Sequence, residues 1–118
     1  MKNQTLPRRL GFALAGLKSA WRTENSFKTH VVAAGAVLLV LSWLRPSALW
    51  WAIGLLTIAF VLAAELFNTA VEGLADHLHP DQHPAIKTVK DCAAGAVLVA
   101  SIAALAVAAA FVYDLALG

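Results

Sequence analysis

The amino-acid sequence predicts an all-α integral membrane protein in which an amphipathic surface helix precedes three membrane-spanning helices. Of its 118 residues, 60% are hydrophobic and only 14% are charged, whereas about a quarter of the residues of an ordinary soluble domain are charged. Three apolar segments stand out, at residues 31–44, 48–64 and 92–113. These features exclude a soluble fold, and residues 1–118 are predicted to form a single domain.

The segment before the first apolar run, residues 8–27, is predicted to form the surface helix. Its apolar side chains recur at intervals of three and four residues, which places them on one helical face: Leu10, Leu14, Leu17, Ala20 and Trp21. The cations in and beside the segment are Arg8, Arg9, Lys18, Arg22 and Lys28. An apolar face accompanied by cations is typical of a helix that lies in the membrane interface.

Membrane spans are predicted at residues 29–44, 48–75 and 87–113, because about 20 residues cross the hydrocarbon core. The polar break at residues 45–47 contains a proline, so the first two spans are expected to form a helical hairpin. Tryptophans gather around this break, where an aromatic belt would lie: Trp43, Trp50 and Trp51.

The basic residues predict the orientation of the chain. Of the nine Lys and Arg residues, eight precede the first span or lie between the second and third, and only Arg45 lies in the other connection. Because basic residues accumulate on the cytoplasmic side, the N-terminus and residues 77–91 are predicted to be cytoplasmic and the C-terminus outside. Six of the seven acids then share the cytoplasmic side. This mixture predicts a polar site rather than a purely basic surface, and no nucleic-acid partner is expected.

A polar stripe ends the second span. Glu65, Asn68, Glu72 and Asp76 are separated by three or four residues, so they share one helical face. Acids at the edge of a membrane span are costly to bury and are by default a functional-site hypothesis. A hydrated helix end explains Asp76 equally well, whereas Glu65 adjoins the apolar run directly.

Glu24 is predicted to lie at the same membrane depth as this stripe, where the surface helix turns into the first span. Its carboxylate could share one cation with Glu65 and Glu72, because the cytoplasmic ends of the spans meet at this level. The alternative is that Glu24 balances Arg22 or Lys28 at the surface.

Lys90 and Asp91 open the third span. The free amides and partial positive charge of a helix N-terminus suit a phosphate group, while snorkelling of lysines towards the headgroups is the alternative. The preceding loop contains His77, His79 and His83. Their spacing matches no established zinc pattern, so a solvated loop with at most one nucleotide contact is favoured.

Together these residues favour phosphoryl transfer. Magnesium is commonly held by one or two carboxylates with substrate phosphates, and the reaction also needs a base near the acceptor hydroxyl and a cation on the phosphates. Glu65 is the predicted base because it is the carboxylate nearest the apolar run. The sequence contains neither a Walker A loop nor a protein-kinase glycine loop. Two other classes compete: a small proton-coupled transporter, whose ionisable groups often lie near the midplane, and a non-catalytic assembly subunit.

Three stretches resemble the small trimeric prokaryotic lipid kinases, a family that comprises diacylglycerol kinase and undecaprenol kinase. They are G-L-K-S-A-W-R-T-E-N-S-F-K at residues 16–28, A-E-L-F-N-T-A-V-E-G-L-A-D at 64–76 and K-D-C-A-A-G-A-V-L at 90–98. The resemblance implies ATP-dependent phosphorylation of a membrane lipid alcohol in the bacterial cytoplasmic membrane. Diacylglycerol, converted to phosphatidic acid, is the first expectation and undecaprenol the alternative. A homotrimer with active sites shared between neighbouring subunits is also implied, with magnesium accompanying ATP.

The same resemblance implies roles for individual residues. Glu65 corresponds to the family's general base and Asn68 to its neighbour. The implied magnesium ligands are Glu24 and Glu72. The implied nucleotide-binding residues are Asp76, His83, Lys90 and Asp91. The implied lipid contacts are Glu65 and Ala94.

Some positions depart from the best-known diacylglycerol kinase pattern. Phe12-Ala13-Leu14 replaces an aromatic-serine-tryptophan segment, and a basic residue expected nearby has only Arg8 or Arg9 as shifted candidates. His30 and Ala93-Ala94-Gly95 look more like the undecaprenol kinase branch. These departures leave the phosphoryl-transfer residues unchanged. They affect the prediction of which lipid alcohol is the acceptor.

Overall fold

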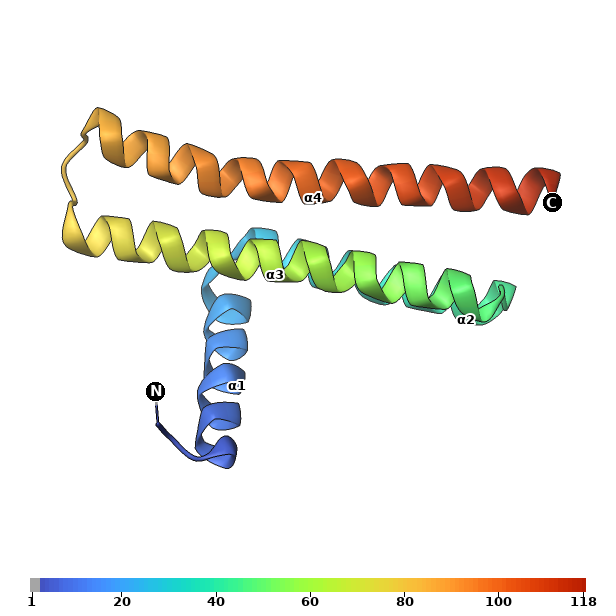
Figure 1. Cartoon of the computed structure of the whole chain (residues 1–118), viewed down its shortest axis with the longest axis horizontal. Helices are drawn as coiled ribbons and strands as arrows, with labels where there is room; N and C mark the ends of the chain where they lie inside the picture. The colour runs from blue at the N-terminus through green and yellow to red at the C-terminus, as the bar shows by residue number, and fades with distance from the viewer. Residues whose placement is uncertain (1–2) are drawn as a thin grey trace.

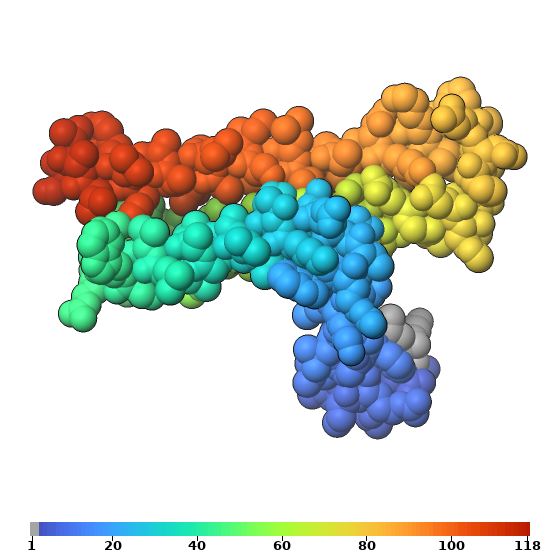
Figure 2. All heavy atoms as spheres, turned by 180° about the vertical axis from the view of Figure 1, so that it is seen from behind, coloured from blue at the N-terminus to red at the C-terminus, as the bar shows by residue number. Residues whose placement is uncertain are grey.

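The computed structural model describes residues 3–118, which form four helices joined by short connections (Figure 1). The helices are α1 (Leu6–Thr23), α2 (Asn25–Leu44), α3 (Ala48–Leu78) and α4 (Pro84–Leu117). Helix α3 packs against both α2 and α4, and α1 projects steeply away from these three (Figures 1 and 2). The predicted all-α architecture is confirmed.

Helices α2, α3 and α4 are all long and apolar enough to cross a membrane. With 31 and 34 residues, α3 and α4 are about 46 and 51 Å long, which exceeds the hydrocarbon core of roughly 30 Å. Their surplus turns lie beyond the start of α2, at the end where α3 connects to α4 (Figure 1). We call this the polar end, defined by Glu24, residues 72–91 and the loop within them.

The α2–α3 connection is the predicted hairpin turn. Arg45 adopts a left-handed conformation with φ 51° and ψ 56°, and its N–H donates to the carbonyl of Leu41. Pro46 follows and cannot continue the helix. Near this end Trp50 Nε1 donates to Asp114 Oδ2 at 2.8 Å, which joins α3 to α4.

The boundary between the surface helix and the first span differs from the prediction. The sequence pattern favours a surface helix over 8–27 and a span from residue 29, whereas α1 ends at Thr23 and α2 begins at Asn25. Glu24 lies between them in an extended conformation, with φ −113° and ψ 108°. This single non-helical residue redirects the chain without the glycine or proline that normally marks such a break.

The chain buries few side chains against itself. The buried apolar residues are Ala20, Phe27, Leu41, Val61, Ala75 and Ala100. Large apolar side chains on the outer helix faces, including Leu39 and Leu56, are more than two-thirds exposed at 74% and 72%. Such surfaces are stable when they contact lipid or other membrane helices rather than water.

Candidate active site at the polar end

Glu65 is the one buried charged side chain among residues 3–118, with 3% of its surface exposed. It lies on α3 and faces α2, where His30 Nδ1 is 2.7 Å from its Oε1 atom. A buried carboxylate without a partner is strongly unfavourable. The His30 contact therefore offsets part of the cost of placing this acid in an apolar setting.

Asn68 follows Glu65 one turn along α3 and is half-buried. Its Oδ1 atom is buried and has no hydrogen-bond partner within the described part of the chain. An unsatisfied buried acceptor costs about 1–3 kcal/mol. A native polar group left in this state is a candidate for contact with a ligand.

The outer part of the predicted stripe joins α3 to α4. Lys90 Nζ donates a hydrogen bond to Asp76 Oδ1. Glu72, one turn before Asp76, is half-buried and interacts favourably with the Lys90 charge. Exposure thus increases along the stripe, from buried Glu65 to exposed Asp76. The stripe connects an apolar environment to a solvated one.

An open recess of about 560 Å³ lies between the α3–α4 loop and the start of α4. Three of the predicted nucleotide residues line it: His83, Lys90 and Asp91. Asp91 pairs with Lys87 at 2.6 Å, so it does not pair with adjacent Lys90. His83 has an additional structural role, because its Nδ1 atom accepts from the Ala85 N–H and caps α4.

No group of three or more His, Cys, Asp or Glu side chains in residues 3–118 is arranged to hold a metal ion by itself. Glu24 and Glu72, the predicted magnesium ligands, are both half-buried, and neither forms an ion pair within these residues. Two unpaired carboxylates still fit magnesium, because this ion commonly takes one or two carboxylates and completes its shell with phosphates and water.

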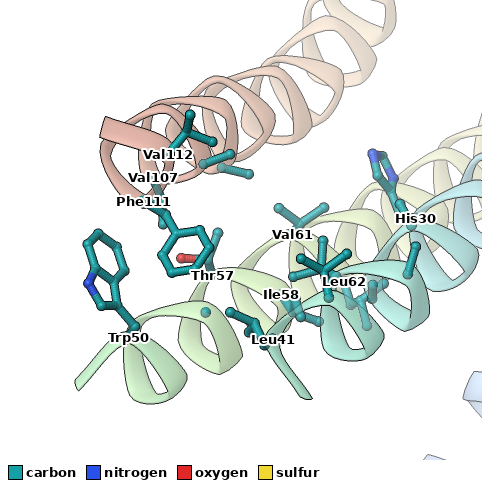
Figure 3. A pocket seen from close by; sticks show the side chains of 18 residues that line it. His30, Leu41, Trp50, Thr57, Ile58, Val61, Leu62, Val107, Phe111 and Val112 are labelled. Atoms are coloured by element: carbon teal, nitrogen blue, oxygen red, sulfur yellow. The ribbon is translucent and has the colours of Figure 1, made fainter. Parts of the chain in front are cut away.

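An apolar cavity of about 380 Å³ lies between α2, α3 and α4 (Figure 3). It extends from His30 towards Trp50 and Phe111, past Ile58, Val61 and Leu62 (Figure 3). His30 is the one ionisable side chain among the described residues that line it. The cavity therefore connects a mostly apolar interior to the His30–Glu65 contact.

The chain does not bring all predicted site residues to one point. Asp76 follows Glu65 by eleven positions on α3, a separation of about 16 Å along the helix axis. Lys90 lies at the level of Asp76 through their ion pair, and Ala94 is exposed one turn further along α4. Glu65 and the group around Lys90 are thus separate features of one subunit.

The contact between His30 and Glu65 is the feature that sequence reasoning missed. The sequence marks His30 only as a residue typical of one family branch. The positions of the two residues in the sequence could have indicated the contact, because His30 lies near the start of the first span and Glu65 near the polar end of the second. Antiparallel pairing of these helices brings both to one depth, but their relative rotation decides whether the side chains touch.

The fold and this site define a membrane-embedded protein in which a buried carboxylate lies between an apolar cavity and a polar recess. The chain belongs to the prokaryotic diacylglycerol kinase family, whose model matches residues 11–112. This family consists of lipid kinases, so the predicted family and enzyme class are confirmed.

Individual relatives carry two different names. The chain is 40% identical to a diacylglycerol kinase of Synechocystis over 97 residues, which cover 81% of this chain and 55% of that protein. It is 39% identical to the undecaprenol kinase of Bacillus subtilis over 87 residues, covering 74% and 71%. It is 28% identical to the diacylglycerol kinase of Escherichia coli K12 over 95 residues, covering 80% and 78%. The matched region thus spans about half the length of the Synechocystis protein and more than two thirds of the length of each of the other two proteins.

Proposed function

We propose that this protein transfers the γ-phosphoryl group of ATP to the hydroxyl group of a membrane lipid alcohol. The observation that carries the proposal is buried Glu65, which adjoins the apolar cavity through His30 and leads along the stripe to the polar recess. A lipid hydroxyl and a phosphate must meet at such a boundary. Membership of the lipid kinase family favours this activity over the transporter and the assembly subunit.

In the proposed reaction, Glu65 accepts the proton of the lipid hydroxyl as the lipid oxygen attacks the γ-phosphorus. The bond from that phosphorus to the bridging oxygen breaks, and ADP leaves with the electron pair. The unpaired Oδ1 atom of Asn68, one turn away, is available to orient the acceptor or a water molecule. General-base catalysis of this kind typically contributes about 10²- to 10⁴-fold to the rate.

The nucleotide is proposed to bind in the polar recess. Lys90 supplies a cation for the phosphates, and His83, Asp76 and Asp91 lie beside it or on the recess wall. Glu24 and Glu72 would hold magnesium, which supplies charge compensation for the phosphates when bound. Asp76, Lys87 and Asp91 are largely exposed and Lys90 is partly exposed, so exchanging these two ion pairs for ligand contacts costs little.

Diacylglycerol is the proposed acceptor, and the product is then phosphatidic acid. Undecaprenol is the second candidate, because a relative of nearly equal identity is named undecaprenol kinase. Both acceptors combine a primary alcohol with long apolar chains that the cavity and the lipid-facing surface would accommodate. Ala94, at the apolar side of Lys90 on α4, is proposed to contact the lipid.

The active form is proposed to be a homotrimer in the bacterial cytoplasmic membrane, with the polar end and the N-terminus in the cytoplasm. The basic residues around the polar end support this orientation. The separation of Glu65 from Lys90 and the exposed apolar faces support sites that are completed by a neighbouring subunit.

Transfer of labelled phosphate from ATP tests the function. Purified protein in mixed micelles is incubated with magnesium, γ-labelled ATP and diacylglycerol, undecaprenol or ceramide, and the label in the extracted lipid is counted. We expect the fastest labelling with diacylglycerol. Faster labelling of undecaprenol would make undecaprenol, rather than diacylglycerol, the preferred acceptor. No labelling of any lipid alcohol would contradict the proposal.

A further inference from the structure

His30 and Glu65 form a close pair between two helices. His30 Nδ1 lies on α2, 2.7 Å from Glu65 Oε1 on α3, and the two side chains are 29% and 4% exposed. Two lone pairs repel at this distance, so one of the two atoms must carry a proton. When Glu65 is ionised and ready to act as a base, that proton belongs to His30 Nδ1.

The pair is close without being fully aligned. His30 Nδ1 makes no hydrogen bond of good geometry within the described chain, despite the short distance. The proposed hydrogen bond therefore requires a small reorientation of the imidazole or of the carboxylate. No other residue in 3–118 competes for this nitrogen as a hydrogen-bond partner.

His30 also ends the apolar cavity (Figure 3). In this position its ring contacts the base on one side and the space open to an apolar ligand on the other. One side chain therefore lies beside both the carboxylate of Glu65 and the apolar cavity.

We propose that His30 is a positioning residue for Glu65, an inference that rests on the proposed kinase function. Nδ1–H donates to Oε1 and thereby turns Oε2 towards the acceptor hydroxyl, whose proton Oε2 receives. The proton on Nδ1 remains on His30 throughout. Because misplacement of a reacting group by about 1 Å can cost 10²-fold in rate, loss of this contact lowers kcat rather than the affinity for ATP.

The matched substitutions are His30→Asn and His30→Leu. The Asn amide nitrogen lies close to the position of Nδ1 and retains a donor, whereas Leu has similar bulk without one. We expect His30→Leu to lower kcat by about 10- to 100-fold with an unchanged KM for magnesium-ATP, and His30→Asn to recover most of the loss. His77 is an exposed histidine at the end of α3, so His77→Leu is the control for a His-to-Leu change and should leave kcat unchanged.

A double-mutant cycle separates positioning from general disruption. If His30 acts through Glu65, adding His30→Leu to Glu65→Gln produces no further loss, since interacting residues are not additive. Equal losses in His30→Leu and His30→Asn, or additive losses in the double mutant, overturn the positioning role. An inactive wild-type protein overturns the kinase function itself, so the two failures are distinguishable.

A spectroscopic measurement does not depend on activity. Nitrogen-15 NMR of histidine-labelled wild-type protein in detergent, with the His30 signal identified by its absence in His30→Asn, reports which ring nitrogen carries the proton. We expect a proton on Nδ1 at neutral pH. A neutral His30 protonated only on Nε2 contradicts the proposed hydrogen bond.

Discussion

Subunits that are inactive for different reasons should restore each other if an active site takes Glu65 from one chain and Lys90 from another. In a single subunit, Lys90 lies at the level of Asp76, about 16 Å along α3 from Glu65. Glu65→Gln removes the proposed base, and Lys90→Ala removes the proposed phosphate cation. Each homogeneous variant should therefore be inactive.

The expected recovery follows from counting sites. In a cyclic trimer with one site at each interface, a random equal mixture places both wild-type residues at about one quarter of the sites. We therefore expect about one quarter of the wild-type phosphoryl-transfer rate after the two variants are unfolded together and reconstituted in micelles. A tag on one variant and a pull-down of the other confirm that the chains mixed.

A second mixture is the matched control. Glu65 and Glu72 lie on the same face of the same helix, so a mixture of Glu65→Gln and Glu72→Gln subunits should show no more activity than the average of the two variants measured separately. Recovery in neither mixture, despite confirmed mixing, would refute the division of Glu65 and Lys90 between chains. Recovery in both would show that Glu72 also comes from the neighbouring chain.

Two further predictions concern the metal and the unsatisfied amide. Glu24→Gln and Glu72→Gln should each shift the magnesium dependence of the rate to higher concentration, because each removes a proposed negative ligand. Magnesium titrations that superimpose on the wild-type curve after scaling would exclude both residues as ligands. Asn68→Ala should lower the rate about tenfold without lowering the thermal unfolding midpoint, because it removes an unsatisfied acceptor that costs about 1–3 kcal/mol. A lower midpoint with an unchanged rate would assign Asn68 to packing instead.

The three spans and the polar stripe could be predicted because they depend on patterns within single segments. Apolar length predicts a span, and a spacing of three or four residues places Glu65 and Asn68 on one face. The end of the surface helix could not be predicted in this way. Glu24 leaves the helical conformation without a local glycine or proline, and the packing of α1 and α2 against α3 determines where the chain bends.

Contacts between helices were the least predictable part of the site. The sequence places Lys90 beside Asp91, yet Lys90 pairs with Asp76 across to α3 and Asp91 pairs with Lys87 on its own helix. The His30–Glu65 contact likewise depends on how α2 and α3 are rotated about their axes. Sequence periodicity describes one helix at a time and contains no information on that rotation.

The most direct test of the account is the rate of labelled phosphate transfer to diacylglycerol by the wild-type protein and by Glu65→Gln. The substitution keeps the volume of the side chain and removes its ability to accept a proton. We predict a loss of about 10²- to 10⁴-fold, with the elution volume of the detergent-solubilised oligomer unchanged. A variant that keeps more than about a tenth of the wild-type rate would contradict the assignment of Glu65 as the base.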